Sequence, residues 1–144
     1  MKLLDASVLL HAYDPDFREH ERSRRWLEEA LSNPERVGLA WVAVLAFLRI
    51  ATNPRAFPRP LSIPEATRIV TEWLETPNVT VLAPGERHWD ILRGLLSVAQ
   101  ARADLVMDAH IAALGLEHGA SVCTDDRDFA RFPGLRLENP LEDR

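Results

Sequence analysis

The sequence has 144 residues, of which 47% are apolar and 27% are charged, and its formal net charge is −5. This length suits one domain with a core of its own, and the balance of apolar to charged residues excludes a disordered chain. The acidic charge argues against an ordinary basic surface for nucleic acid, unless several acids gather around cations that reverse the local sign. We expect one domain, residues 1–144.

The single cysteine, Cys123, can form no disulfide within the chain, so a reducing compartment is expected. It ends the apolar run 120–123, which favours a buried thiol over a reactive one. Asp5 comes too early for the apolar region of a signal peptide. The apolar stretch nearest membrane length, 37–51, has 15 residues and is too short to cross a bilayer. We therefore predict a cytoplasmic protein with no membrane partner.

Short apolar runs alternate with amphipathic segments along the chain. The runs are typical of strands, and apolar residues three and four apart are typical of helices. Ser62 or Ile63 is expected to cap one helix, with Pro64 in its first turn. In chain order the pattern predicts a strand at 2–4, a helix from 7, a helix at 19–31, a strand at 37–39, a helix at 41–51, a proline-rich surface connection at 53–64, a helix to about 74, a strand at 79–82, helices at 86–98 and 105–118, a strand at 120–123 and a last short strand at 135–137.

Strands that alternate with helices predict an α/β fold with a mostly parallel central sheet flanked by helices. Ligands of such sheets bind at the carboxyl ends of the strands. Polar residues that directly follow a predicted strand are therefore the first candidates for a functional site.

Two acids occupy positions that are expected to be buried rather than exposed to solvent. Asp5 directly follows the strand at 2–4, although on its own it is more often a cap for the next helix. Asp108 lies in 105–114, a segment that is apolar on nearly every face. An isolated buried carboxylate is costly unless it binds a cation. The alternative for Asp108 is an acid in the first helical turn, favoured by the helix dipole.

Asp126 and Asp128 follow the strand at 120–123, where a polar loop that caps a short helix is the simpler interpretation of these two alone. If the strands that begin at Lys2 and Ala120 are neighbours, however, all these acids converge on one crevice. Carboxylates so close together cannot all ionise without a counter-ion. Ligation by oxygen alone suits Mg²⁺ or Mn²⁺ rather than zinc, and such a site activates water at a phosphoryl centre.

The remaining polar and aromatic residues carry weaker signals. His110 is two residues from Asp108, so it points away from it on a helix and is expected to be structural. The five histidines lack metal-binding spacing, and no nucleotide-binding, nucleophile-elbow or paired-cysteine motif is present. The four tryptophans lie on apolar helix faces and are expected in the core: Trp26, Trp41, Trp73 and Trp89.

Four motifs follow one another along nearly the whole chain: LLDASVL at 3–9, FLRIATNP at 47–54, DAHIAAL at 108–114 and TDDRDFARF at 124–132. In kind and order they resemble the PIN-domain toxins of the VapC type. The resemblance implies a Mg²⁺- or Mn²⁺-dependent endoribonuclease that cleaves RNA as the toxin of a type II toxin–antitoxin pair. It also implies a homodimer that a cognate VapB-type antitoxin keeps silent.

By the same resemblance, Asp5, Asp108 and Asp126 match the first, third and fourth acids of the family, which are the expected metal ligands and catalytic residues. Asp128 is expected to contribute to catalysis. Thr124 matches the hydroxyl residue before the fourth acid, which is expected to hold the water or the phosphate of the substrate.

One departure from the family pattern concerns its second acid, usually a glutamate on the helix after the second strand. The segment 40–49 contains no acid, and the expected position falls near Val44. Asp104, four residues before Asp108, shares its face if the helix extends back that far; otherwise it caps the helix from 105.

The missing acid leaves three functions open. RNA hydrolysis leads, followed by a catalytically weakened module that binds RNA or antitoxin, and then by a hydrolase of small phosphoesters.

Overall fold

A computed structural model describes residues 1–142 of the protein. These residues form one five-stranded sheet with the order β3-β2-β1-β4-β5, and each neighbouring pair of strands is parallel. The predicted α/β fold with a mostly parallel sheet is confirmed. The strands are β1 (Lys2–Leu4), β2 (Val37–Leu39), β3 (Val79–Val81), β4 (Ser121–Cys123) and β5 (Leu137–Glu138).

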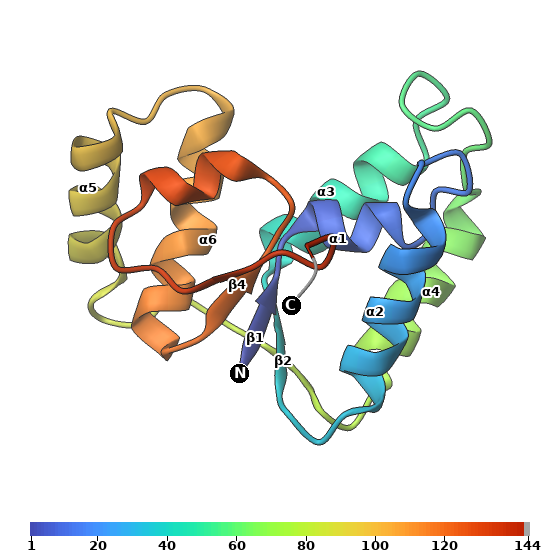
Figure 1. Cartoon of the computed structure of the whole chain (residues 1–144), viewed down its shortest axis with the longest axis horizontal. Helices are drawn as coiled ribbons and strands as arrows, with labels where there is room; N and C mark the ends of the chain where they lie inside the picture. The colour runs from blue at the N-terminus through green and yellow to red at the C-terminus, as the bar shows by residue number, and fades with distance from the viewer. Residues whose placement is uncertain (143–144) are drawn as a thin grey trace.

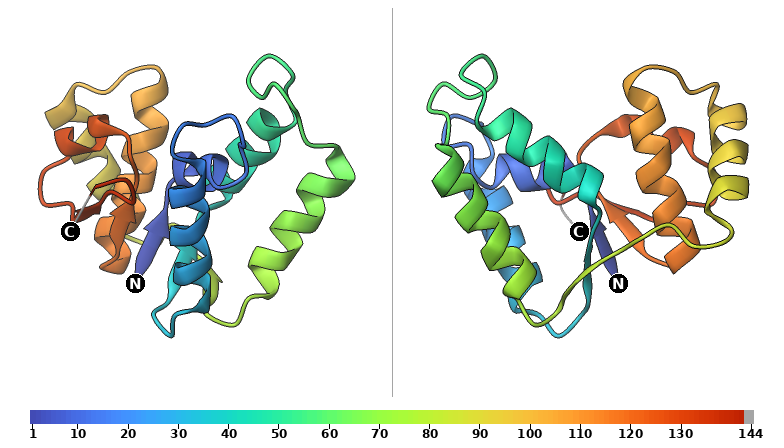
Figure 2. Two further views of the ribbon diagram at one scale, coloured as in Figure 1. Left: turned by 45° about the vertical axis from the view of Figure 1, so that its right-hand side comes forward. Right: turned by 180° about the vertical axis from the view of Figure 1, so that it is seen from behind.

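The helices fall into two groups on either side of the central strands (Figures 1 and 2). One group holds α1 (Ala6–His11), α2 (His20–Ser32), α3 (Trp41–Ala51) and α4 (Ile63–Glu75). The other holds α5 (His88–Ala99) and α6 (Asp104–His118), with the short 3₁₀ helix η1 (Arg127–Arg131) after β4. Among the described residues, no helix is both long and apolar enough to span a bilayer.

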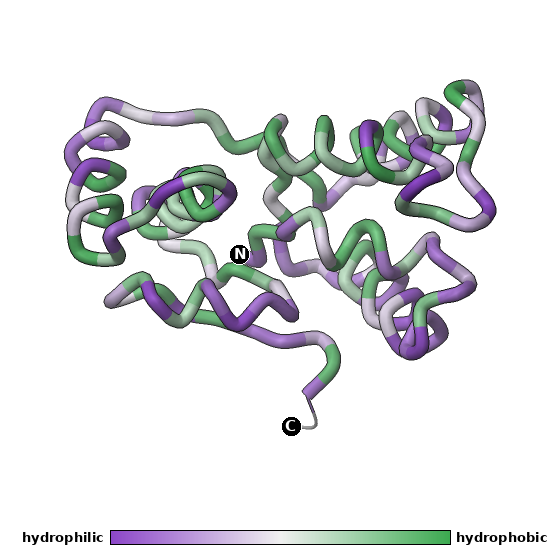
Figure 3. The backbone as a smooth tube through the Cα atoms, turned by 90° about the horizontal axis from the view of Figure 1, so that it is seen from above, coloured by the Kyte–Doolittle hydropathy of each residue, from purple (hydrophilic) through white to green (hydrophobic). Residues whose placement is uncertain are grey.

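The central strand β1 is covered on both faces, as parallel strands require. Leu3 and Leu4 have no exposed surface. In the neighbouring strand, Gly38 allows a close approach, since an added Cβ there would lie 2.7 Å from Cδ1 of Leu82. Most helices carry both apolar and polar residues (Figure 3), and buried apolar residues such as Leu27 of α2 and Val44 of α3 belong to this core.

The order of strands reverses at β1, and this reversal places the candidate site. From β1 the chain adds β2 and β3 on one side, and β4 and β5 follow on the other. Leu4 pairs with Cys123, so Asp5 and Thr124 leave the sheet side by side. Open parallel sheets bind their ligands at such a switch point.

Two element boundaries differ from the prediction in ways that matter below. Helix α6 begins at Asp104, and Ala103, whose φ is +54°, occupies its N-cap position. The last strand lies at Leu137–Glu138 rather than at 135–137. Ser62, one of two predicted caps of α4, is the cap: its Oγ accepts a hydrogen bond from the backbone N–H of Glu65 at 3.2 Å.

The prediction that all four tryptophans lie in the core is wrong for two of them. Trp73 is buried, and its ring packs edge-on against Phe47 with centroids 4.7 Å apart. Trp41 and Trp89 are more than half exposed. The sequence pattern shows which residues share a helix face, but it does not show which face meets the sheet.

Candidate metal centre

Asp5 stands at the N-cap position of α1, yet its side chain makes no capping hydrogen bond. Its Oδ2 instead accepts a hydrogen bond from Oγ1 of Thr124 at 2.9 Å and another from Oγ of Ser7 at 3.1 Å. The residue is 9% exposed, and burial raises the pKa of its carboxyl group, although both hydroxyls oppose the shift. The side chain is therefore part of a polar cluster rather than a helix cap.

Thr124 joins the ends of the two central strands. Its buried hydroxyl donates to Asp5 and accepts a hydrogen bond from the backbone N–H of Asp126 at 3.0 Å. Its Oγ1 also lies 3.4 Å from Oγ of Ser7. These contacts orient the acids, and the prediction that Thr124 binds the substrate stays a prediction.

Asp126 caps η1, because its Oδ1 accepts a hydrogen bond from the backbone N–H of Asp128 at 2.9 Å. The interpretation of this segment as a polar loop that caps a short helix is therefore correct. Asp126 also acts on the other acids, since its charge helps to raise the pKa values of both Asp5 and Asp108. Asp126 and Asp128 are both exposed at the edge of the cluster.

Asp108 brings a carboxylate to the cluster from α6. It is partly buried rather than fully enclosed, and Val106 and Met107 on the same helix are exposed, so this helix is less buried than its apolar sequence predicts. Burial, and after it the charges of four carboxylates, together raise the pKa of Asp108 to about 7; these carboxylates belong to Asp5, Asp126, Asp128 and Asp104. The carboxylates after β1, on α6 and after β4 therefore lie near enough for their charges to interact, and their convergence on a metal stays a prediction.

The donor chemistry of this cluster fits a hard divalent cation. Within residues 1–142, no three Asp, Glu, His or Cys side chains lie close enough together to form a ligand shell as they stand. Burial, and after it the charges of neighbouring carboxylates, nevertheless disfavour the ionised forms of Asp5 and Asp108 by raising their pKa values. Since carboxylates are the ligands that Mg²⁺ and Mn²⁺ prefer, a cation that draws these acids together would supply a compensating charge.

The position near Val44, where the family's second acid was expected, faces the core. Val44 is 1% exposed, and Phe47 on the same side of α3 is fully buried. The interpretation of Asp104 as a helix cap is wrong, because Ala103 takes that position and Asp104 lies in the first turn. Asp104 and Asp108 thus share a helix face. Whether Asp104 binds metal stays a prediction.

The sequence prediction missed Ser7 and Asp125. Ser7 comes two residues after Asp5, so one helical turn can return its hydroxyl to that carboxylate. Asp125 stands between two predicted site residues, and its carboxylate contacts His11 of α1. The Asp-x-Ser spacing could have indicated Ser7, whereas the role of Asp125 depends on the register of β1 and β4.

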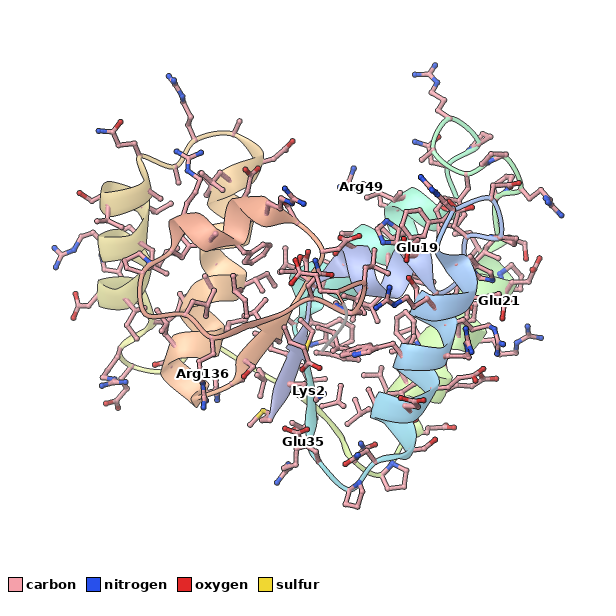
Figure 4. All side chains as sticks on the ribbon, viewed as in Figure 1. Lys2, Glu19, Glu21, Glu35, Arg49 and Arg136 are labelled. Atoms are coloured by element: carbon pink, nitrogen blue, oxygen red, sulfur yellow. The ribbon has the colours of Figure 1, made fainter. Side chains whose placement is uncertain are left out.

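Two other polar features lie outside the cluster. His110 packs α6 against α5, since its Nδ1 lies 3.0 Å from Nε2 of His88, which confirms its structural role. A surface cavity of about 580 Å³ lies at the amino ends of the strands, beside Lys2, Trp26 and Glu35. Figure 4 shows Lys2 and Glu35 at this opposite end, so the cavity does not belong to the acid cluster.

Comparison with known proteins identifies the class. The family model described as PIN domain matches residues 2–135. Ribonuclease VapC37 of Mycobacterium tuberculosis is 47% identical over 97% of both chains. The structure of FitAB bound to the IR36 DNA fragment has a TM-score of 0.69 at 21% identity and covers 100% of this chain and 98% of that one. A toxin–antitoxin complex from Klebsiella pneumoniae has a TM-score of 0.65 at 19% identity, over 99% of this chain and 100% of that one.

The two structural likenesses show the shared fold, and the family match and the ribonuclease show the family. The chain belongs to the PIN-domain family, in the branch of the VapC ribonucleases.

Proposed function

We propose that the chain is the toxin of a type II toxin–antitoxin pair, an endoribonuclease that hydrolyses RNA phosphodiester bonds with Mg²⁺ or Mn²⁺ held by Asp5, Asp108 and Asp126. One observation carries the proposal: at the point where the strand order reverses, the charge of Asp126 helps to raise the pKa of Asp5, and the charges of Asp5 and Asp126 help to raise that of Asp108. The similarity to a VapC ribonuclease over 97% of the chain supports RNA as the substrate.

When bound, the metal supplies an activated water and offsets the negative charge that develops at phosphorus. Residues of the chain orient the metal ligands and accept the proton. Thr124 and Ser7 hold the Asp5 carboxylate in one orientation, so the ligand is fixed before metal or RNA arrives. Asp128 is exposed beside the cluster and is suited to accept the proton that the attacking water loses. A cation among these acids also reduces the repulsion between a chain of charge −5 and RNA.

We further propose that a cognate VapB-type antitoxin silences the enzyme by directing a cationic side chain, such as an arginine, towards the acids in place of the metal. The fold shared with solved toxin–antitoxin complexes supports such a partner. Trp41 and Leu45 stand one turn apart on α3 and are both more than half exposed. Exposed apolar side chains so close together favour a surface that another chain covers, which supports the homodimer.

The test is RNA cleavage by the purified chain with Mn²⁺ and with EDTA. EDTA should abolish cleavage, and Asp108→Asn should lower it at least about a hundredfold, the upper end of the loss that outer-sphere changes cause at metal sites. Asp90→Asn is the matched control, because Asp90 is an exposed acid of α5 whose Oδ1 lies 3.3 Å from Arg93. Its activity should equal that of the wild type.

Three results would contradict this function. Cleavage that persists in EDTA or in Asp108→Asn would exclude the metal site. RNA that is bound but stays intact would identify a weakened binding module. Hydrolysis of a small phosphoester in preference to RNA would identify a phosphoesterase.

A further inference from the structure

Consecutive residues of the loop after β4 make different contacts. Thr124 and Asp126 interact with the acid cluster, where the hydroxyl of Thr124 bonds Asp5 and the charge of Asp126 acts on Asp108. Asp125, between them, lies at a bend and turns its carboxylate to α1. Its Oδ2 lies 2.9 Å from Nδ1 of His11. Because a carboxylate only accepts hydrogen bonds, Nδ1 of His11 is the donor.

His11 is the last residue of α1, and it is held on two sides. Its ring stacks on Phe17, with centroids 3.7 Å apart and planes 9° apart. Its backbone carbonyl accepts a hydrogen bond from Nδ1 of His20 at 3.0 Å. A ring fixed in this way presents its nitrogen to Asp125 in one position.

The loop is therefore bound at both ends of helix α1. Asp5, just before the helix, receives the Thr124 hydroxyl, and His11, at its end, binds Asp125. The helix has six residues, a length of about 9 Å, so the two attachment points are close and the helix between them is stiff. Movement of Asp125 would move both of its neighbours, which belong to the metal cluster.

The surroundings of the pair shield it from solvent. The shielding is partial, since His11 and Asp125 are 24% and 19% exposed, and Val8, Ser23 and Pro140 line the space beside them. The 2.9 Å contact between the ring of His11 and the carboxylate of Asp125 makes these two residues partners.

We propose that His11 is a positioning residue of the metal centre: through Asp125 it fixes the loop after β4, so that Thr124 and Asp126 face Asp5 in the arrangement that binds the cation. His11 itself contacts neither metal nor RNA. The inference rests on the proposed function, since it assigns His11 a part in that same site.

The test measures Mn²⁺ affinity by electron paramagnetic resonance on the purified chain, together with RNA cleavage over a range of Mn²⁺ concentrations. His11→Ala should raise the Kd for Mn²⁺ about tenfold, the lower end of the effect that outer-sphere partners have. Saturating Mn²⁺ should restore most of the cleavage. His11→Asn, whose amide can donate to Asp125, should recover most of the affinity.

A double variant and a control make the result specific. His11→Ala with Asp125→Ala should bind Mn²⁺ as weakly as either single variant, because both remove one contact. His118→Ala is the matched control: this histidine also makes one hydrogen bond, to the carbonyl of Ala83 at 2.8 Å, but it ends α6 away from the loop. Its Kd should be unchanged.

Each outcome is distinguishable from a failure of the proposed function. A wild-type chain that binds no Mn²⁺ overturns the metal site itself. A wild type that binds Mn²⁺ while His11→Ala binds it equally well overturns the role of His11 alone. If His11→Ala does not fold, His11→Asn and Asp125→Ala decide: the first should bind Mn²⁺ nearly as well as the wild type and the second about tenfold more weakly, and equal affinity in the two variants would overturn the proposal.

Discussion

At the scale of single residues, Asp108 and Asp125 are shifted in opposite directions. Burial and four neighbouring carboxylates raise the pKa of Asp108 to about 7. For Asp125, burial acts in the same direction but is outweighed by His11, so its pKa falls below the usual value. The difference separates a carboxylate that needs an external cation from one that already has a partner within the chain.

The raised pKa of Asp108 predicts how the metal-free protein responds to pH. The unfolded chain loses this proton near pH 3.8, whereas the folded chain keeps it until about pH 7. Between these values the folded state binds more protons, so the contribution of Asp108 to the free energy of unfolding decreases as pH rises. Urea unfolding in EDTA from pH 4.5 to pH 7.5 should show this decline, and it should be smaller in Asp108→Asn. An equal slope in Asp90→Asn and Asp108→Asn would contradict the shift.

At the scale of elements, helix α3 departs from the family pattern at the expected position of the second acid. The pattern places a second acid near Val44, but that side chain is 1% exposed in the core. Val44→Glu should therefore lower the free energy of unfolding by roughly 3 kcal/mol or more, because it buries an unpaired charge, and it should not raise activity. Arg49→Glu, on the exposed side of the same helix, should cost less than about 1 kcal/mol by urea unfolding. Higher activity in Val44→Glu would show that this position reaches the metal.

Much of the architecture was predictable from the sequence because it depends on local pattern. Runs such as 2–4 and 37–39 are apolar on both faces, which only a covered parallel sheet requires, and both strands form there. Asp5 and Asp126 could be chosen because they follow strands. The contacts of the Thr124 hydroxyl with Asp5 and Ser7 could not be predicted, because they depend on the register that pairs Leu4 with Cys123. The exposed side of each helix, and hence the position of Trp41, depends on packing that the sequence does not record.

At the scale of the whole molecule, the fold gathers acids that repel one another at the switch point of the sheet. A cation that binds only the folded chain adds RT ln(1 + [L]/Kd) to the free energy of unfolding, about 2.7 kcal/mol at a hundredfold excess over Kd. The metal is therefore expected to act on stability as well as on the reaction, and the stability effect can be measured without any RNA.

The most direct test of the metal centre is the thermal melting of the wild type and of Asp5→Asn, each with EDTA and with Mn²⁺. Mn²⁺ should raise the Tm of the wild type by roughly 2–8 °C. In EDTA, Asp5→Asn should be at least as stable as the wild type, because it removes a buried charge, while its amide oxygen can still accept the hydrogen bonds of Thr124 and Ser7. Its shift with Mn²⁺ should be smaller. A variant less stable than the wild type in EDTA, with an undiminished Mn²⁺ shift, would show that Asp5 is structural and would contradict the metal centre.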